Sequence, residues 1–522
     1  FWLKAHTSYV CPVVRPIGST ISDMAARQMC EGSAGSAAAE APAEAPAGDK
    51  PNGHGAPADG PQVNPFSVEG EVDYDKLVDD FGCSRIDDAL IQRFERLTGR
   101  RAHLLLRRGM FYTHRDLDKL LDDYERGTPF YLYTGRGPST ESLHVGHLVP
   151  FLFTKYLQDA FDVPLVVQLT DDEKFYFKDG MTLEECRRMS FENAKDIIAC
   201  GFNPDKTFIF RDTDYMGTMY PVVAKAAKLI SYNQCHGVLG DHINANIGRV
   251  MYSSIQAAPA FPGTFPKMFG SRKDIRCLIP QGIDQDPFFR LCRAIAPRMG
   301  ETKPACIHSK FLPSLQGPGS KMSSSGSAGA EFEVSVEQAA RAPGFRFDED
   351  LLVLEVKDKS LKKQRLAAGL RIRAANGCRV STAAEYQRIL EEHRGASVSL
   401  TVAPLPATVF MNDSANAIKH KVQRYGFSGG QDTKELQQKH GANLHVDMPY
   451  QFLRHIMDDD ARLDQIGSDY AAGRMMTGEV KQICIDELTA LVEGHKERLA
   501  KVTDEVVAHF MNPDRDSLRR FG

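Results

Sequence analysis

The segment FYLYTGRGPSTESLHVGHLVPFLFTKYL, residues 130–157, decides the fold of this chain. Its opening, Phe130–Thr134, is rich in aromatic residues and predicts a strand. A turn rich in glycine and proline follows. Apolar residues then recur with a helical period, at Leu148, Phe151, Leu152 and Tyr156. The segment therefore predicts a strand, a turn and a helix in succession, which is the repeating unit of an α/β sheet.

The same alternation continues downstream. Pro164–Thr170 is an apolar run typical of a buried strand, and residues 207–212 (TFIFRD) and 303–309 (KPACIHS) are further candidate strands. Between them, Thr182 and Glu185 have the spacing of a capping box at the start of a helix. Strands that alternate with helices predict a parallel sheet with crossover connections. The predicted fold class is therefore α/β with a Rossmann-like parallel sheet.

Composition sets broad limits on function. The chain has 522 residues, a net charge of −4 and 42% hydrophobic residues, enough for a large core and two or three domains. Any contact with nucleic acid must therefore come from local basic patches. No run of 18 apolar residues occurs, so no membrane-spanning helix is expected. The eleven cysteines have no CxxC spacing, which indicates free thiols in a reducing compartment.

His144 and His147 lie where the predicted helix begins, and three interpretations are open at this point. A metal site needs three or four protein ligands, and only Glu141 lies close enough in sequence to add a third. The apolar neighbours Val145 and Leu148 are equally consistent with core histidines.

The third interpretation is a phosphate site. Ligands of open α/β sheets bind at the carboxyl ends of strands, and a helix N-terminus there presents N–H groups to an anion. Gly146 has no side chain, which lets a flat ring lie directly against the helix. The two histidines would then face a phosphate.

Two signatures resemble those of a known family. HVGH (144–147) is similar to the HIGH signature of class I aminoacyl-tRNA synthetases, and KMSSS (321–325) is similar to their second signature. Further matching stretches are FYLYTGRGPS, QLTDDEKF, FENAKDIIACGF, SIQAAPAF, CLIPQGIDQDPFFR and FSGGQDT. Together they resemble the eukaryotic cytosolic-type tryptophanyl-tRNA synthetases over residues 64–325 and 407–515.

This resemblance implies a two-step reaction. Tryptophan and ATP would form tryptophanyl-adenylate and pyrophosphate, and the tryptophan would then move to tRNA(Trp). Neither step needs a protein nucleophile, so catalysis would come from positioning and charge stabilisation. The resemblance also implies Mg²⁺ accompanying ATP without a dedicated protein cage, a homodimer and a cytoplasmic location, with no membrane or DNA partner.

The resemblance assigns residues to the ATP side of the site. His144, His147 and Lys321 are the expected catalytic residues, and no resident metal is expected. The expected ATP-binding residues are Gly135, Arg136, Gly146, Asp284, Met322, Ser323, Ser324 and Ser325. For Arg136, the alternative is an ordinary solvated loop arginine.

The resemblance also assigns a tryptophan pocket. The expected tryptophan-binding residues are Tyr133, Gln168, Glu173, Gln256 and Gln285. Tyr133 and Gln168 would bind the indole N–H, and Glu173 and Gln256 the ammonium group. Asp432, within FSGGQDT, matches a position near the anticodon. Asp286, just before Pro287, has the pattern of a helix N-cap and is expected to be structural.

We expect six regions along the chain. They are a disordered low-complexity region (1–62), an N-terminal extension packing on the catalytic domain (63–128), a Rossmann-like catalytic domain (129–325), an inserted module (326–406), a helical anticodon-binding domain (407–499) and a C-terminal helix that returns to the catalytic domain (500–522). Residues 1–30 contain three cations and one acid, a composition that is compatible with a targeting segment.

The inserted module departs from the family pattern. Residues 357–379 contain eight basic residues and the acid Asp358. We hypothesise that the module contacts the tRNA backbone or a partner protein, and the alternative is a solvated surface insertion.

Three rival functions remain open. The first is the same chemistry with tyrosine, the second a catalytically silent copy retained as a binding protein, and the third a nucleotidyltransferase with the same phosphate signature. The third would leave the long helical C-terminal part unexplained.

Overall fold

The computed structural model describes residues 73–240, 245–321, 329–337 and 344–521. The expected low-complexity region over 1–62 lies outside these residues. No helix within the described ranges is long and apolar enough to cross a membrane. The nine cysteines that the described ranges contain are free thiols, as expected.

A seven-stranded sheet forms the centre of the catalytic part. In spatial order its strands are β1 (Ser84–Arg85), β2 (Phe111–Arg115), β7 (Ala305–Ser309), β6 (Arg276–Gly282), β3 (Phe130–Arg136), β4 (Leu165–Leu169) and β5 (Thr207–Arg211). The strands from β7 to β5 are parallel, which confirms the predicted sheet. The antiparallel edge made by β1 and β2 was not predicted.

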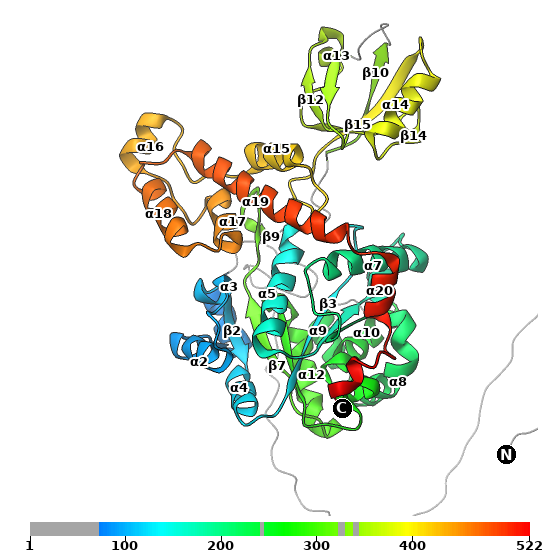
Figure 1. The fold of residues 1–522 in the computed structure, drawn as a ribbon, viewed down its shortest axis with the longest axis vertical. Helices are drawn as coiled ribbons and strands as arrows, with labels where there is room; N and C mark the ends of the chain where they lie inside the picture. The colour runs from blue at the N-terminus through cyan, green and yellow to red at the C-terminus, as the bar shows by residue number, and fades with distance from the viewer. Residues whose placement is uncertain (1–72, 241–244, 322–328, 338–343, 522) are drawn as a thin grey trace, which may run out of the picture. The chain divides into compact units, whose positions relative to one another are not determined.

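Helices cover both faces of this sheet (Figure 1). The helices of this part are α1 (Tyr74–Phe81), α2 (Asp88–Thr98), α3 (Leu104–Arg107), α4 (Leu117–Glu125), α5 (Val145–Phe161), α6 (Asp171–Phe177), α7 (Leu183–Ile198), α8 (Asp212–Leu229), α9 (Tyr232–Leu239), α10 (Ile247–Ala257), α11 (Pro266–Phe269) and α12 (Asp286–Met299). The core on one face includes residues of α4, α5 and α7, and the core on the other includes residues of α8, α10 and α12.

The strand order places a crevice between β3 and β6. From β3 the chain adds β4 and β5 on one side, and β6 and β7 on the other. The pairing of β3 with β6 ends at Leu132 and Leu278, although β3 runs on to Arg136 and β6 to Gly282. The two strands therefore separate at their carboxyl ends, which is where open α/β sheets bind ligands.

Two helices begin where the sequence predicted. Thr182 accepts from the backbone N–H of Glu185, and Glu185 accepts from the backbone N–H of Thr182, so the predicted capping box is present. The helix α5 begins at Val145, directly after His144, as the periodicity predicted.

A separate small sheet follows the lysine signature. It has the order β10-β15-β13-β14, beside a β11–β12 hairpin. The elements are β10 (Phe332–Glu337), β11 (Phe345–Phe347), β12 (Val353–Val356), α13 (Lys359–Lys363), β13 (Leu370–Ala375), β14 (Cys378–Arg379), α14 (Ala383–Glu392) and β15 (Ser397–Pro404). These elements have an apolar core of their own.

The C-terminal part is helical, as predicted. Its helices are α15 (Ala415–Tyr425), α16 (Lys434–His440), α17 (Met448–Ile456), α18 (Asp460–Ala471), α19 (Thr477–Leu499) and α20 (Asp504–Met511). His495 of α19 lies 3.0 Å from Asp196 of α7, and both side chains are buried. Leu518, near the C-terminus, is buried in the core on the α8–α10–α12 face. The end of the chain therefore packs against the catalytic sheet.

Candidate active site

A cavity of about 570 Å³ opens at the carboxyl ends of β3, β4 and β6. Eleven of the residues predicted from sequence lie on its wall: Tyr133, Gly135, Arg136, His144, Gly146, His147, Gln168, Glu173, Gln256, Asp284 and Gln285. They come from the ends of β3 and β4, the first turns of α5 and α6, the end of α10 and the turn after β6, so their proximity arises from the parallel arrangement of the sheet.

The two histidines stack on each other at the start of α5. Their ring centroids are 3.5 Å apart, and the rings are 25° from parallel. Glu141 pairs with Arg188 at 2.6 Å, so the third ligand of the metal interpretation is engaged elsewhere. His144 is buried, but both histidines line the cavity.

The segment that follows the inserted module holds the histidine signature in place. The Val145 N–H donates to the carbonyl of Val409 at 3.0 Å, and the Met411 N–H donates to the carbonyl of Leu143 at 2.8 Å. His144 and Phe410 form an antiparallel bridge between these two bonds. Residues distant in sequence thus fix the backbone of the first α5 turn.

Arg136 is the last residue of β3 and not a solvated loop arginine. Its guanidinium is buried, and Nε donates to the side-chain oxygen of Asn193 at 3.1 Å. Burial lowers its pKa to about 10, so Arg136 remains cationic at neutral pH. It therefore brings a fixed positive charge to the cavity wall.

Tyr133 and Gln168 form a hydrogen-bonded pair on adjacent strands. The Tyr133 hydroxyl donates to Oε1 of Gln168 at 2.5 Å, and Nε2 of Gln168 donates to Oδ1 of Asp212 at 2.7 Å. Burial raises the pKa of Tyr133 well above its usual value, so the hydroxyl stays protonated. The tyrosine and amide oxygens keep lone pairs that can accept from an N–H group.

Glu173 stands at the start of α6 within a local network. Its carboxylate accepts from Thr170 at 2.6 Å and from Lys174 at 2.7 Å. A Cβ at Gly137 would lie 2.2 Å from Cε of Lys174, so a larger residue there would displace the end of the lysine side chain. The cation Lys174, which also lines the cavity, was not predicted.

Gln256, Gln285 and Asp284 form a chain of weak contacts at the cavity wall. Nε2 of Gln256 donates to Oε1 of Gln285 at 3.4 Å, and Nε2 of Gln285 donates to Asp284 at the same distance. Long contacts of this kind can be exchanged for shorter ones to a bound molecule.

The lysine signature begins close to the cavity. Lys321 is the last residue of β9 (Gly317–Lys321), and its backbone is paired with Pro313 of β8 (Pro313–Ser314). Leu312, the residue before Pro313, lines the cavity. The backbone of Lys321 is therefore one strand away from the cavity wall. The predicted residues Met322, Ser323, Ser324 and Ser325 lie outside the described residues.

Asp432 does not line the cavity. It is exposed in the loop before α16. The prediction of an anticodon contact concerns a different part of the molecule from the cavity.

Asp286 is structural, but not in the predicted way. It is the first residue of α12, and the residue in the N-cap position is Gln285. Its carboxylate accepts from Nε and a terminal nitrogen of Arg115 at 2.7 and 2.8 Å and lies 3.1 Å from Nε2 of His308. Arg115 on β2 and His308 on β7 bind the carboxylate inside the core. Their hydrogen bonds and charges hold the pKa of Asp286 low, although burial alone would raise it.

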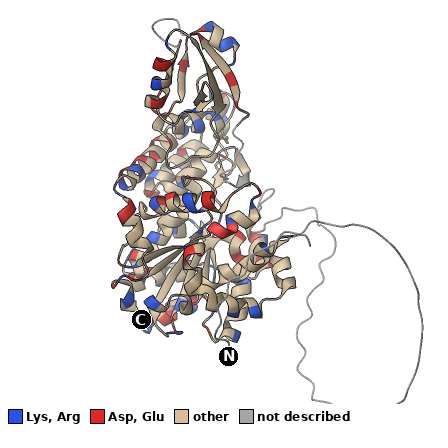
Figure 2. Cartoon of the chain, turned by 90° about the vertical axis from the view of Figure 1, so that its right-hand side faces the viewer, with Lys and Arg blue, Asp and Glu red and all other residues tan. Residues whose placement is uncertain are grey.

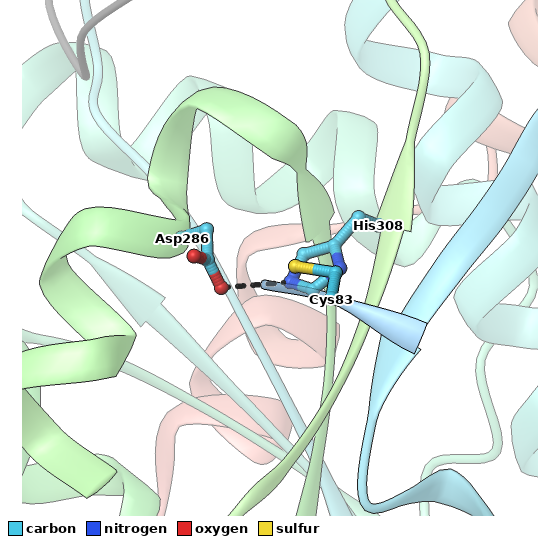
Figure 3. Close-up of side chains that lie close together, drawn as sticks. All are labelled: Cys83, Asp286 and His308. Atoms are coloured by element: carbon cyan, nitrogen blue, oxygen red, sulfur yellow. Dashed lines mark ion pairs between the residues drawn. The ribbon is translucent and has the colours of Figure 1, made fainter. Parts of the chain in front are cut away.

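Cys83, Asp286 and His308 also have the composition of a metal site (Figure 3). Their potential ligand atoms lie within 4.8 Å of one another. However, the Asp286 carboxylate already binds Arg115 through both oxygens, and Arg290 lies 3.5 Å away. Two guanidinium groups would repel a metal cation. We interpret the cluster as an ion-pair network, and the absence of a resident metal stays a prediction.

Comparisons with known proteins agree with this geometry. The family model of class I tRNA synthetases (W and Y) matches residues 125–331. The cytoplasmic tryptophan–tRNA ligase of Arabidopsis thaliana is 43% identical over 454 residues, covering 86% of this chain and 93% of that protein. The chain belongs to the tryptophan–tRNA ligase family.

Other members of the tryptophan–tRNA ligase family support the assignment. The human cytoplasmic enzyme is 42% identical over 458 residues, covering 86% of this chain and 80% of that protein. The crystal structure of Plasmodium falciparum tryptophanyl-tRNA synthetase has a TM-score of 0.67 and 38% identity, and the match covers 86% of this chain and 98% of that one.

Two further residues that bear on a tryptophan–tRNA ligase site were not predicted. Lys310 lines the cavity just after β7, and its amine lies 5.3 Å from the centre of the Tyr112 ring. Asp212 holds the amide of Gln168. Asp212 directly follows β5 and Lys310 directly follows β7, so a polar residue at a strand's carboxyl end is the signal that could have found them.

Proposed function

We propose that the chain activates L-tryptophan with ATP and transfers it to tRNA(Trp). The observation that carries this function is the Tyr133–Gln168 pair, because two oxygens on the cavity wall can accept from an indole N–H. A substrate without that N–H leaves the buried pair unsatisfied, which discriminates strongly between substrates.

The first step needs positioning and charge stabilisation. A carboxylate oxygen of tryptophan attacks the α-phosphorus of ATP, and the bond to the bridging oxygen of pyrophosphate breaks. We assign His144 and His147 to donate to the phosphates, and Gly146 to make room for the adenosine. Arg136 supplies a buried cation on the same wall. Magnesium accompanies ATP and shields the phosphates.

Lys321 meets the triphosphate as pyrophosphate leaves, and Met322 to Ser325 add backbone and hydroxyl groups. Support for this role is the β8–β9 pairing, which keeps the backbone of Lys321 beside the residue that follows Leu312. Gly135 and Asp284 face the ATP side of the cavity, and Gln285 faces the amino acid.

Glu173 and Gln256 hold the tryptophan ammonium in this proposal. The Glu173 carboxylate has two oxygens that already accept from Thr170 and Lys174. Each carboxylate oxygen accepts more than one hydrogen bond, so an ammonium can join this network. The side-chain oxygen of Gln256 has no partner among the described residues and can accept from the same ammonium.

The helical part after 407 is proposed to bind the anticodon, with Asp432 as a contact to unstacked bases. We also propose a cytoplasmic location and a homodimer. Support for the dimer comes from large apolar side chains that are exposed on neighbouring helices: Phe175 on α6, Tyr232 on α9, and Ile247 and Met251 on α10.

ATP–pyrophosphate exchange tests the function. The wild-type chain is expected to exchange label with tryptophan and not with tyrosine. Lys321→Met should lower kcat by at least about a hundredfold, because one charge-stabilising contact in the transition state is worth several kcal/mol. Lys119→Met, an exposed lysine on α4, is the matched control. Exchange with tyrosine alone, or with no amino acid, would overturn the proposal.

A further inference from the structure

The side chain of Gln281 is buried in the cavity wall, and its amide forms no hydrogen bond with the described residues. Only 8% of Gln281 is exposed. Neither Nε2 nor Oε1 of its amide has a hydrogen-bond partner within the described part of the chain. Native proteins pair nearly all buried polar groups, so an unpaired amide at a cavity indicates a ligand contact.

The strand geometry places this amide on the face that carries the tryptophan-binding residues. Side chains alternate along a strand, so Gln281 shares a sheet face with Cys277 and Ile279. Both of these residues belong to the core that contains Tyr131 and Tyr133 of β3. Gln281 therefore lies on the β6 side of the crevice, and Tyr133 lies on the β3 side.

Beside Gln281, the strands β3 and β6 are no longer paired. Pairing between β3 and β6 ends at Leu132 and Leu278, three residues before Gln281. On the β3 side, the cavity wall continues through Gly135, which has no side chain. Gly135 and Gln281 both line the cavity, so a substrate that extends from Tyr133 toward the start of α5 can contact the Gln281 amide.

Chemical matching selects the group that Gln281 can bind. Tryptophan offers an indole N–H, an ammonium and a carboxylate, and the first two are donors already assigned to other residues. The carboxylate is an acceptor, and a carboxamide supplies two N–H donors. Two of the cations on this wall are already engaged, since Lys174 is paired with Glu173 and Arg136 is bonded to Asn193. Lys178, Arg249 and Lys310 line the same cavity.

We propose that the Gln281 amide donates to the carboxylate of tryptophan and then to the acyl carbonyl of the adenylate. This inference rests on the proposed function and adds a binding residue to it. The same contact would hold the attacking oxygen in the crevice between the amino-acid and ATP sides. No protonation change or covalent step of the protein is involved.

The test compares tryptophan with tryptamine, which lacks the carboxylate. Dissociation constants are measured by calorimetry for the wild type and for Gln281→Met, together with the melting temperature of the free protein. We expect Gln281→Met to weaken tryptophan binding at least tenfold and to leave tryptamine binding unchanged. The melting temperature should stay the same or rise, because an unpaired buried amide is removed.

Gln158→Met is the matched control. Gln158 is also buried, but it donates to Thr207 and accepts from the backbone N–H of Asn203, both at 2.9 Å. This variant should lower the melting temperature and leave the ratio of the two dissociation constants unchanged. If Gln281→Met fails to fold, Gln281→Ala provides the same comparison.

The outcomes separate this inference from the proposed function. Wild-type protein that binds no tryptophan overturns the proposed function. Wild-type binding with an unchanged tryptophan-to-tryptamine ratio in both Gln281 variants overturns the role of Gln281 alone. A melting temperature that falls in both variants, as for Gln158→Met, together with that unchanged ratio, would make Gln281 a structural residue.

Discussion

Nε2 of Gln168 lies 2.7 Å from Oδ1 of Asp212, and this contact decides which end of the amide faces Tyr133. Oδ1 of Asp212 accepts this hydrogen bond, so it holds the NH₂ group and leaves Oε1 for the tyrosine. Burial and the neighbouring Asp172 raise the pKa of Asp212 well above its usual value, and the carbonyl oxygen of a protonated carboxyl group accepts in the same way. Asp212 is therefore a positioning residue for indole recognition.

Asp212→Asn should weaken this orientation, because an asparagine amide can also donate to Gln168 and turn it around. We expect KM for tryptophan to rise about tenfold, or about 1.4 kcal/mol, with a smaller change in kcat. The benzofuran analogue of tryptophan, which lacks the N–H, should be affected less. Asp214→Asn, at a half-exposed position on the same helix, is the control. Equal losses with both substrates would contradict the positioning role.

Asp172 should make stability depend on pH. Burial raises its pKa to about 6, above the unfolded value of about 4. The contribution of Asp172 to the free energy of unfolding is therefore complete below about pH 4 and is lost as the pH rises through 6. Asp172→Asn should be more stable than the wild type at pH 8, by on the order of 1–3 kcal/mol, and not at pH 4.5.

Urea unfolding at pH 4.5, 6 and 8 checks this prediction. Asp171→Asn is the contrast, since Asp171 accepts from the backbone N–H of Thr213 at 3.2 Å and from its hydroxyl at 2.5 Å. That variant should lose stability at each pH. A pH-independent difference between Asp172→Asn and the wild type would refute the prediction.

The Asp286 cluster should behave as an ion-pair network. Asp286→Asn leaves the guanidinium of Arg115 without its counterion in a largely buried site, and we expect a loss of about 3–5 kcal/mol in unfolding free energy. Cys83→Ser and dialysis against EDTA should leave both the melting temperature and the metal content unchanged. Metal found by mass spectrometry in the wild type and lost in Cys83→Ser would favour a metal site.

Ile247 tests the proposed dimer. It is 81% exposed on α10, and a charge there would be buried without a partner in any interface formed by this surface. Ile247→Glu should shift the mass measured by analytical ultracentrifugation from dimer to monomer. Leu436 on α16 is 41% exposed, and Leu436→Glu should leave the measured mass unchanged. A monomeric wild type would disprove the dimer.

The inserted module offers a test of backbone binding to tRNA. Lysines and arginines are interspersed with acids along the described chain (Figure 2), so only local groups can supply a basic patch. Five exposed cations gather around α13: Lys357, Lys359, Lys362, Lys363 and Arg365. Replacing them with glutamine should weaken tRNA binding and reduce its salt dependence, by about one unit of slope per lost phosphate contact.

Arg388→Gln with Arg394→Gln, on and after α14, is a control that removes two exposed charges elsewhere in the module. These two substitutions should change tRNA affinity and its salt dependence little. Unchanged tRNA affinity at every salt concentration in the five-residue variant would leave the module as a solvated insertion.

The sequence by itself determined the features that depend on neighbouring residues. The strand at Phe130, the capping box at Thr182 and the start of α5 after His144 follow from periodicity and local hydrogen bonding. The prediction for Asp286 was wrong because its local cap pattern competed with Arg115, a residue far away in sequence that gives a stronger ionic contact.

Only the tertiary structure decided which distant side chains meet. The hydrogen bond from Gln168 to Asp212, the bridge from Phe410 to His144 and the burial of the Gln281 amide without a hydrogen-bond partner among the described residues depend on how strands and helices pack. Such contacts leave no periodic trace, because each joins residues from separate elements and is selected by burial and charge, not by the conformation of a single segment.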